Sequence, residues 1–271
     1  MHIENLLDPE SRALLQQWAK PSTLMAFDFD GTLAPIVDDP ARASMTEPAW
    51  NALKALASVA RVAVISGRGR DNLSRLVPHE VSYLIGNHGC EGLPQRDPNF
   101  ADKAITCADW YDKLISNPSL KSVTQGALIE NKGLSLALHY RHCQNQALAR
   151  SKLLARASEL TPPPRIIRGC YVINLLPPPA VTKREALLAL MADCGAERAI
   201  FVGDDFTDEL VFEDAPDNWL TVRVGEVVFS QARYCIHSVQ EMTSFLELLT
   251  QLLRPPAGQP VHQPVWEAKT G

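Results

Sequence analysis

Apolar positions in the first 92 residues follow two alternating patterns. Short continuous runs predict buried strands, and stretches with an apolar residue every three to four positions predict helices. The predicted strands are Leu24 to Asp28, Arg61 to Ile65 and Val81 to Ile85. The predicted helices are Pro9 to Ala19, Thr46 to Ser58 with Thr46 as cap, and Arg70 to Val77. This alternation is typical of a parallel, doubly wound sheet whose working site lies at the carboxyl ends of the strands.

A different order begins at about Leu93, where a helix followed by two strands is predicted twice. The helices are Ala104 to Ile115 and Gln146 to Leu160, and the strands are Gly126 to Glu130, Leu134 to Tyr140, Arg165 to Arg168 and Cys170 to Leu176. Runs of three prolines, at 162–164 and 177–179, flank the second strand pair. This order is typical of a small α+β domain.

The first pattern returns after Pro179, so the α+β domain is predicted to be an insertion into an α/β core. The later helices are Arg184 to Cys194, Asp208 to Ala215 and Gln240 to Leu253, and the strands are Arg198 to Val202 and two more near Leu220 and Tyr234. We therefore predict an N-terminal helix in residues 1–20, a core made of 21–96 and 181–254, and an inserted domain at 97–180. Residues 255–271 hold four prolines among small and polar residues and predict a flexible tail.

Composition excludes several classes of protein. Of the 271 residues, 46% are hydrophobic and 21% are charged, which is typical of a folded globular chain. The net charge of -5 argues against a nucleic-acid partner. The longest uncharged stretch, Gly169 to Thr182, has 14 residues including three prolines, so no membrane-spanning helix of about 20 residues is predicted.

The six cysteines, at 90, 107, 143, 170, 194 and 235, form no Cys-x-x-Cys pair. We expect them to be free, buried thiols. The segment from Met1 to Lys20 is amphipathic and charged, unlike a secretory signal, and we expect a cytoplasmic protein.

The strongest chemical signal is Asp28-Phe29-Asp30-Gly31-Thr32, at the end of the first predicted strand. Side chains two positions apart on a strand face the same side, so both carboxylates can face one site. One carboxylate can attack phosphorus as a nucleophile, and the other can protonate the leaving oxygen. The alternative is a helix cap or a solvated turn, but a buried strand rarely ends in two carboxylates without a cation.

Gly203-Asp204-Asp205-Phe206-Thr207-Asp208-Glu209 follows another apolar strand. Acidic loops at two strand ends of one sheet can meet over a hard cation, and ligation by carboxylates alone favours Mg²⁺. The alternative interpretation is that Thr207 and Asp208 merely begin the next helix.

Ser66-Gly67-Arg68 ends a third strand and offers a hydroxyl, a backbone N–H and a guanidinium. These groups suit phosphate oxygens, and Lys183 can add a counter-charge. Alone, Ser-Gly-Arg is an ordinary turn and Lys183 an ordinary surface lysine. Only the combination with the acidic loops points to phosphate chemistry.

Together, these four segments in this chain order resemble the signature loops of the haloacid dehalogenase superfamily of phosphotransferases. Within it, the chain resembles the trehalose-6-phosphate phosphatase family over roughly residues 22–250. That likeness is carried by Asp28 to Pro35, Ser66 to Arg68, Gly86-Asn87-His88-Gly89, Glu130-Asn131-Lys132-Gly133 with His139-Tyr140-Arg141, and Gly203 to Glu209. The resemblance implies a Rossmann-like core with the inserted domain as a cap.

The resemblance also implies roles for the core residues. Asp28 would be the nucleophile and a Mg²⁺ ligand, and Asp30 the general acid and base, with its backbone carbonyl on the metal. Asp204 would complete the protein's metal ligands, and Asp208 would be a supporting carboxylate. Thr32, Ser66, Gly67 and Lys183 would hold the phosphate.

Substrate recognition is expected from both domains. Arg68, Asn87, His88 and Gly89 would contact the sugar from the core, and Glu130, Lys132, His139, Arg141 and Asn174 from the cap. Asn174 stands where the family commonly has glutamate, so the acceptor charge is lost there. Arg184 follows Lys183 where glycine is usual, which bears on the helix start alone. An ordinary solvated sheet face would also account for the charged residues of the cap.

The expected function is Mg²⁺-dependent hydrolysis of trehalose 6-phosphate through an aspartyl-phosphate intermediate, in trehalose biosynthesis. The expected partner is a small-molecule sugar phosphate, and the oligomeric state is left open. Two alternatives are a phosphatase for another sugar phosphate and a non-catalytic regulatory module that binds a phosphosugar.

Overall fold

The chain forms two compact units, each with its own sheet. The structure is a computed structural model and describes residues 3–37, 39–95, 97–117, 125–226 and 229–254. The first unit comprises residues 1–94, 183–204 and 208–271, and the second comprises 95–182 and 205–207. The tail predicted at 255–271 lies outside the described residues.

The first unit is built on a seven-stranded, wholly parallel sheet in the order β1-β11-β10-β9-β2-β3-β4. Its strands are β1 (Glu4–Asn5), β2 (Thr23–Phe27), β3 (Arg61–Ile65), β4 (Tyr83–Ile85), β9 (Arg198–Gly203), β10 (Trp219–Val224) and β11 (Tyr234–Ile236). Strands β2 and β9 are adjacent although they lie far apart in the sequence, with Thr23 paired to Arg198. The predicted parallel α/β fold is therefore confirmed.

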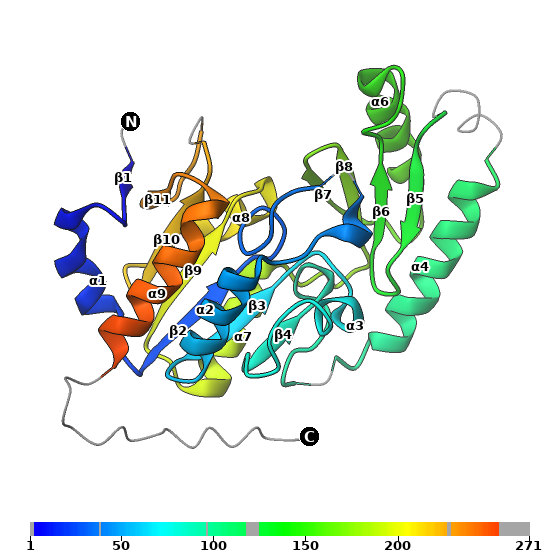
Figure 1. Cartoon of the computed structure of the whole chain (residues 1–271). Helices are drawn as coiled ribbons and strands as arrows, with labels where there is room; N and C mark the ends of the chain where they lie inside the picture. The colour runs from blue at the N-terminus through cyan, green and yellow to red at the C-terminus, as the bar shows by residue number, and fades with distance from the viewer. Residues whose placement is uncertain (1–2, 38, 96, 118–124, 227–228, 255–271) are drawn as a thin grey trace. The chain divides into compact units, whose positions relative to one another are not determined.

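Helices connect these strands and cover the sheet. They are α1 (Arg12–Trp18), α2 (Glu47–Ala57), α3 (Arg70–Leu73), α7 (Lys183–Cys194), α8 (Phe206–Phe212) and α9 (Met242–Leu253), with short 3₁₀ turns at Pro9–Ser11, Pro40–Arg42, Asn87–Gly89 and Val239–Glu241. Helices α2 and α9 lie side by side over one face of the sheet (Figure 1). Their apolar sides close the main core with Phe27, Val64 and Val202 from the strands.

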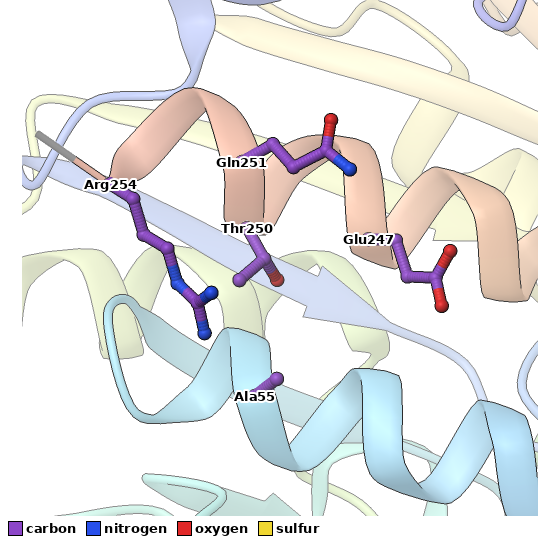
Figure 2. A pocket seen from close by; sticks show the side chains of 5 residues that line it. All are labelled: Ala55, Glu247, Thr250, Gln251 and Arg254. Atoms are coloured by element: carbon purple, nitrogen blue, oxygen red, sulfur yellow. The ribbon is translucent and has the colours of Figure 1, made fainter. Parts of the chain in front are cut away.

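A pocket of about 350 Å³ lies between α2 and α9 (Figure 2). It is lined by Ala55, Glu247, Thr250, Gln251 and Arg254. None of the predicted site residues lines it, so it is separate from the predicted chemistry.

The second unit contains a four-stranded antiparallel sheet in the order β5-β6-β8-β7, and its described residues also form helices. The strands are β5 (Leu128–Asn131), β6 (Leu136–His139), β7 (Arg165–Gly169) and β8 (Val172–Leu176), and the helices are α4 (Phe100–Ile115) and α6 (Gln146–Ala157). Leu136, Leu138, Ile173 and Leu175 on one sheet face pack with Trp110 and Leu153 of these helices. Because strand side chains alternate, the opposite face carries Glu130, His139 and Asn174.

Several predicted boundaries are wrong. The helix predicted at Arg70 to Val77 ends at Leu73, because the next residues form tighter turns in which Leu76 N–H donates to Leu73 C=O. The strand predicted from Cys170 begins at Val172, because Tyr171 takes φ +59° in a turn. The last core helix before β10 is Phe206–Phe212, not Asp208 to Ala215, and Asp214 has φ +49° just beyond its end.

The cysteine prediction needs one correction. None of the six cysteines, all of which lie among the described residues, forms a disulfide, but Cys170 is exposed and Cys194 is half-buried. Cys170 lies in the turn between β7 and β8, and no local pattern indicates that this turn reaches solvent. Among the described residues, no helix is long and apolar enough to cross a membrane.

Candidate active site

Four loops with polar side chains follow adjacent strands of the first unit's sheet. Strands β9, β2, β3 and β4 are neighbours in this order, and they end directly before Asp204, Asp28, Ser66 and Gly86. Parallel strands bring their carboxyl ends to the same edge of a sheet. The backbone N–H of Asp28 still donates to Val202 C=O at 2.9 Å, so the β2–β9 pairing continues into the first acidic residue.

Lys183 links two carboxylates in the interior of this edge. Its Nζ lies 2.9 Å from Asp28 Oδ1 and 2.8 Å from Asp208 Oδ1. All three side chains are buried. Lys183 is the first residue of α7, where a positive charge opposes the helix dipole. Its two carboxylate partners, rather than the helix, therefore explain its position.

Burial and the neighbouring charges shift both pKa values in this group. Burial raises the pKa of Asp28 well above its usual range, Lys183 opposes the shift, and Asp208 and Asp204 add to it. For Lys183, burial lowers the pKa, but Asp208 and Asp28 outweigh it and the net shift is upward. The site thus has more negative charge than one lysine offsets.

Asp204 and Asp208 are tied together by the start of α8. The Asp204 N–H donates to Asp208 Oδ2 at 3.0 Å, and the Thr32 hydroxyl donates to Asp204 Oδ1 at 2.8 Å. Asp28, Asp204 and Asp208 each offer a carboxylate oxygen, and these oxygens lie within 4.8 Å of one another. Hard oxygen donors and excess negative charge fit a divalent cation such as Mg²⁺.

Two glycines allow the acidic side chains to approach the backbone. Gly31 has φ +82°, and a Cβ there would lie 2.0 Å from Asp204 Oδ2. A Cβ on Gly203 would lie 2.2 Å from Asp208 Cγ. Any larger residue at either position would displace a carboxylate of the candidate metal site.

Asp30 has a partner that the sequence did not suggest. Arg68 Nε and Nη2 donate to its two carboxylate oxygens at 2.7 and 2.6 Å. The guanidinium also donates to Asn72 Oδ1 at 2.9 Å and lies 5.4 Å from the centre of the Phe29 ring. Arg68, expected to bind substrate, here holds the carboxylate expected to serve as general acid and base.

Ser66, Gly67, Asn87 and His88 form one packed group after β3 and β4. The His88 N–H donates to Ser66 C=O at 2.9 Å and the Asn87 N–H to Arg68 C=O at 2.8 Å. Asn87 and His88 both have positive φ, which is unusual for two consecutive residues, and Gly89 follows with φ +120°. A Cβ on Gly67 would lie 2.5 Å from His88 Cε1, so Gly67 leaves room for the imidazole.

Glu91 is a site neighbour that sequence reasoning missed. Its Oε2 accepts from Asn87 Nδ2 at 2.8 Å and from the Arg70 N–H at 2.7 Å. A single glutamate in a loop carries no sequence signal for this role. It joins the loops after β3 and β4 and so helps to position Asn87.

The predicted recognition residues of the second unit gather on its polar sheet face. Glu130, Ala137 and Asn174 are in register across β5, β6 and β8, and Asn174 is buried. Glu130 Oε2 lies 3.0 Å from His139 Nε2 and 3.9 Å from Lys132 Nζ. Arg141, beyond the end of β6, stacks over Tyr171 at 5.0 Å from the ring centre. These groups can donate to and accept from hydroxyls.

Comparison with known proteins identifies relatives that match most of this chain. Residues 26–240 match the family described as Trehalose-phosphatase. The trehalose-6-phosphate phosphatase of Escherichia coli is 30% identical over 84% of this chain and 86% of its own length. The trehalose-phosphate phosphatase of Mycobacterium ulcerans is 30% identical over 75% of this chain, which spans about half (54%) of that relative.

A solved structure supports the fold. The C-terminal domain of a Candida albicans trehalose-6-phosphate phosphatase superposes with a TM-score of 0.72 and 23% identity, over 93% of this chain and 99% of that domain. At this identity the likeness concerns the fold. Because the superposition covers 93% of this chain, it includes residues of both units.

Proposed function

This chain belongs to the trehalose-phosphatase family, and from that premise we propose that it hydrolyses trehalose 6-phosphate to trehalose and phosphate with Mg²⁺ as cofactor. The observation that carries the proposal is the group of Asp28, Lys183, Asp204 and Asp208 at the edge of the parallel sheet, in which all but the half-buried Asp204 are buried. It combines a nucleophile, a counter-charge and hard ligands for a divalent cation.

Asp28 is the proposed nucleophile. Its carboxylate oxygen attacks phosphorus, the bond from phosphorus to the sugar oxygen breaks, and Asp30 protonates that oxygen. Water then attacks the aspartyl phosphate while Asp30 takes its proton, and phosphate leaves. The products are one sugar and one phosphate, with both carboxyl groups restored.

The charge around Asp28 is what makes the attack feasible. A carboxylate that approaches a phosphate dianion is strongly repelled, and Lys183, 2.9 Å from Asp28, offsets part of this repulsion. When bound by Asp28, Asp204 and the Asp30 carbonyl, with Asp208 in support, Mg²⁺ would supply positive charge to the phosphoryl oxygens. Thr32, Ser66 and Gly67 complete the proposed phosphate site.

Residues 97–180, which lie within the second unit, are the proposed cap that selects the sugar. Residues 21–96 and 181–254 are the proposed core. Glu130, Lys132, His139, Arg141 and Asn174 supply donors and acceptors there. The core contributes Arg68, Asn87, His88 and Gly89. A cytoplasmic location is part of the same proposal.

Asn174 favours a second candidate, a phosphatase for another sugar phosphate. The residue is buried on the polar sheet face, and its amide is neutral where the family resemblance led us to expect a carboxylate. The non-catalytic module is disfavoured, because a chain that only binds a phosphosugar does not need Asp28, Asp30 and Lys183 together.

Phosphate release from a substrate panel tests the proposal. The panel is trehalose 6-phosphate, glucose 6-phosphate, sucrose 6-phosphate and an aryl phosphate, each with Mg²⁺ and with EDTA. We expect strong preference for trehalose 6-phosphate, lost on chelation. Release from another sugar phosphate alone would show that this other compound is the substrate. Release from none of the four would support the non-catalytic module that binds a phosphosugar.

A further inference from the structure

The turn between β7 and β8 contains a residue in an unfavourable backbone conformation. Gly169 pairs with Val172, so the turn consists of Cys170 and Tyr171. Tyr171 has φ +59°. Glycine and asparagine adopt this left-handed region readily, whereas a bulky side chain is strained there. A turn chosen for stability alone would carry glycine or asparagine at this position.

The strained backbone presents the tyrosine ring in a defined orientation. The Arg141 guanidinium lies 5.0 Å from the ring centre, and the buried Tyr140 packs against the ring edge-on, with centroids 5.9 Å apart and planes at 67°. Tyr171 C=O also accepts from the Tyr140 N–H at 3.0 Å. The side chain nevertheless remains 39% exposed. The ring is therefore held by its neighbours and still open to a ligand.

The ring lies at the same end of the sheet as hydrogen-bonding side chains. Val172, the next residue, pairs with His139 on β6, and the His139 ring lies 3.0 Å from Glu130. The ring and the Arg141 guanidinium thus lie at the end of the sheet where His139 stands on the polar face, paired with Glu130. This combination matches a sugar, which has an apolar C–H face and a rim of hydroxyls.

We propose that Tyr171 is a specificity-determining residue whose ring packs against a sugar ring of the substrate, while Arg141 binds that sugar's hydroxyls. The proposal deepens the proposed function and rests on it, since it assigns a further residue to recognition of a phosphorylated sugar. Tyrosine suits the role because its ring is apolar and its hydroxyl can still bond to water or sugar. Backbone strain that serves binding explains why glycine is absent from the turn.

The test compares Tyr171→Gly, Tyr171→Leu and Tyr171→Phe with the wild-type chain. The first readout is kcat/KM for trehalose 6-phosphate divided by kcat/KM for acetyl phosphate, which has no ring. The second is the midpoint of thermal unfolding. Asp214→Gly is the matched control, because Asp214 also has positive φ and is exposed, but lies in the first unit.

We expect Tyr171→Gly to raise the unfolding midpoint by a few degrees and to lower the substrate ratio at least tenfold, mainly through KM. Asp214→Gly should raise the midpoint and leave the ratio unchanged. Tyr171→Phe should keep the substrate ratio within about twofold of wild type. Tyr171→Leu should lower the ratio as much as Tyr171→Gly does. An unchanged ratio in Tyr171→Gly or in Tyr171→Leu would overturn the proposal, as would a fall in midpoint with parallel loss on both substrates.

A binding experiment separates this inference from the proposed function. Saturation-transfer NMR with free trehalose reports contact with the sugar without turnover. If the wild type hydrolyses no sugar phosphate, the proposed function fails. The role of Tyr171 still stands if trehalose signals are present with wild type and Tyr171→Phe and absent with Tyr171→Gly, and it fails if they persist in Tyr171→Gly.

Discussion

The charged residues gathered in each of the two units differ in how deeply they are buried. In the first unit, Lys183 is 2% exposed and lies 2.9 Å from Asp28. In the second unit, Lys132 lies 3.9 Å from Glu130, whose side chain is 46% exposed. Buried charges interact strongly, and separating them costs much free energy. Exposed ion pairs contribute little to stability and can change partners. The first group therefore suits fixed chemistry and the second suits recognition of a flexible, hydroxylated ligand.

The largest effect is expected from Asp28→Asn, in the buried group of the first unit. The amide cannot act as a nucleophile, so kcat should fall by about 10⁴-fold or more. The fold should persist, because the substitution removes one negative charge from a crowded acidic group. Steady-state kinetics and circular dichroism measure both, with the exposed Asp109→Asn as control. Substantial activity in Asp28→Asn would refute the nucleophile assignment.

Lys183 and Lys132 are matched lysines, one from each group of charged residues. Lys183→Met leaves two buried carboxylates without their cation, so kcat should fall by roughly 100- to 1,000-fold. The free energy of unfolding should fall by about 3–5 kcal/mol. Lys132→Met should change the free energy of unfolding by less than about 0.5 kcal/mol.

For both variants, urea titrations in EDTA measure the free energy of unfolding, and steady-state kinetics in Mg²⁺ measure kcat. Equal destabilisation by Lys183→Met and Lys132→Met would show that burial does not separate the two groups. A normal kcat in Lys183→Met would show that Lys183 has no role in catalysis.

Arg68→Ala tests how the general acid is held. Without its two donors, Asp30 should be poorly positioned, and kcat for trehalose 6-phosphate should fall by about 10- to 100-fold. Acetyl phosphate, whose leaving group needs little protonation, should be much less affected. Asn72→Ala removes only the outer partner of Arg68 and serves as control. A change confined to KM would show that Arg68 binds substrate and does not position Asp30 for catalysis.

The smallest effect is expected from Arg141→Ala in the second unit. KM for trehalose 6-phosphate should rise by about tenfold, since one or two hydrogen bonds are lost. Activity on acetyl phosphate should change far less, because the reacting atoms lie with the first unit's residues. Progress curves at varied substrate concentration measure both constants. Equal losses on the two substrates would exclude Arg141 from specificity.

Local patterns predicted most of the elements and the acidic loops. Arg61 to Ile65 is a strand with the predicted bounds, and Thr46 caps α2 through its hydroxyl, which accepts from the Ala49 N–H at 3.3 Å. Periodicity and capping depend on residues a few positions apart, so they are readable in one segment. The short strand Glu4–Asn5 was missed, because two residues form no pattern and pair only when β11 is in place.

Contacts between distant segments could not be predicted from the sequence. The sequence suggested that Asp30 and Arg68 belong to one site, but it did not pair them. Nor did any local pattern indicate that Tyr171 would adopt a left-handed conformation beneath Arg141. Both depend on the exact direction of side chains, which neighbouring segments set by packing.

Local patterns were enough to predict the succession of strands and helices along the chain, the residue types at the strand ends, and hence the class of chemistry. Short-range periodicity and the alternation of side chains suffice for these features. The contacts between distant side chains depend on the folded structure: Lys183 with Asp28 and Asp208, Arg68 with Asp30, and Arg141 with Tyr171. These pairings form when parallel or antiparallel strands come into register and bring together residues that are far apart in the chain.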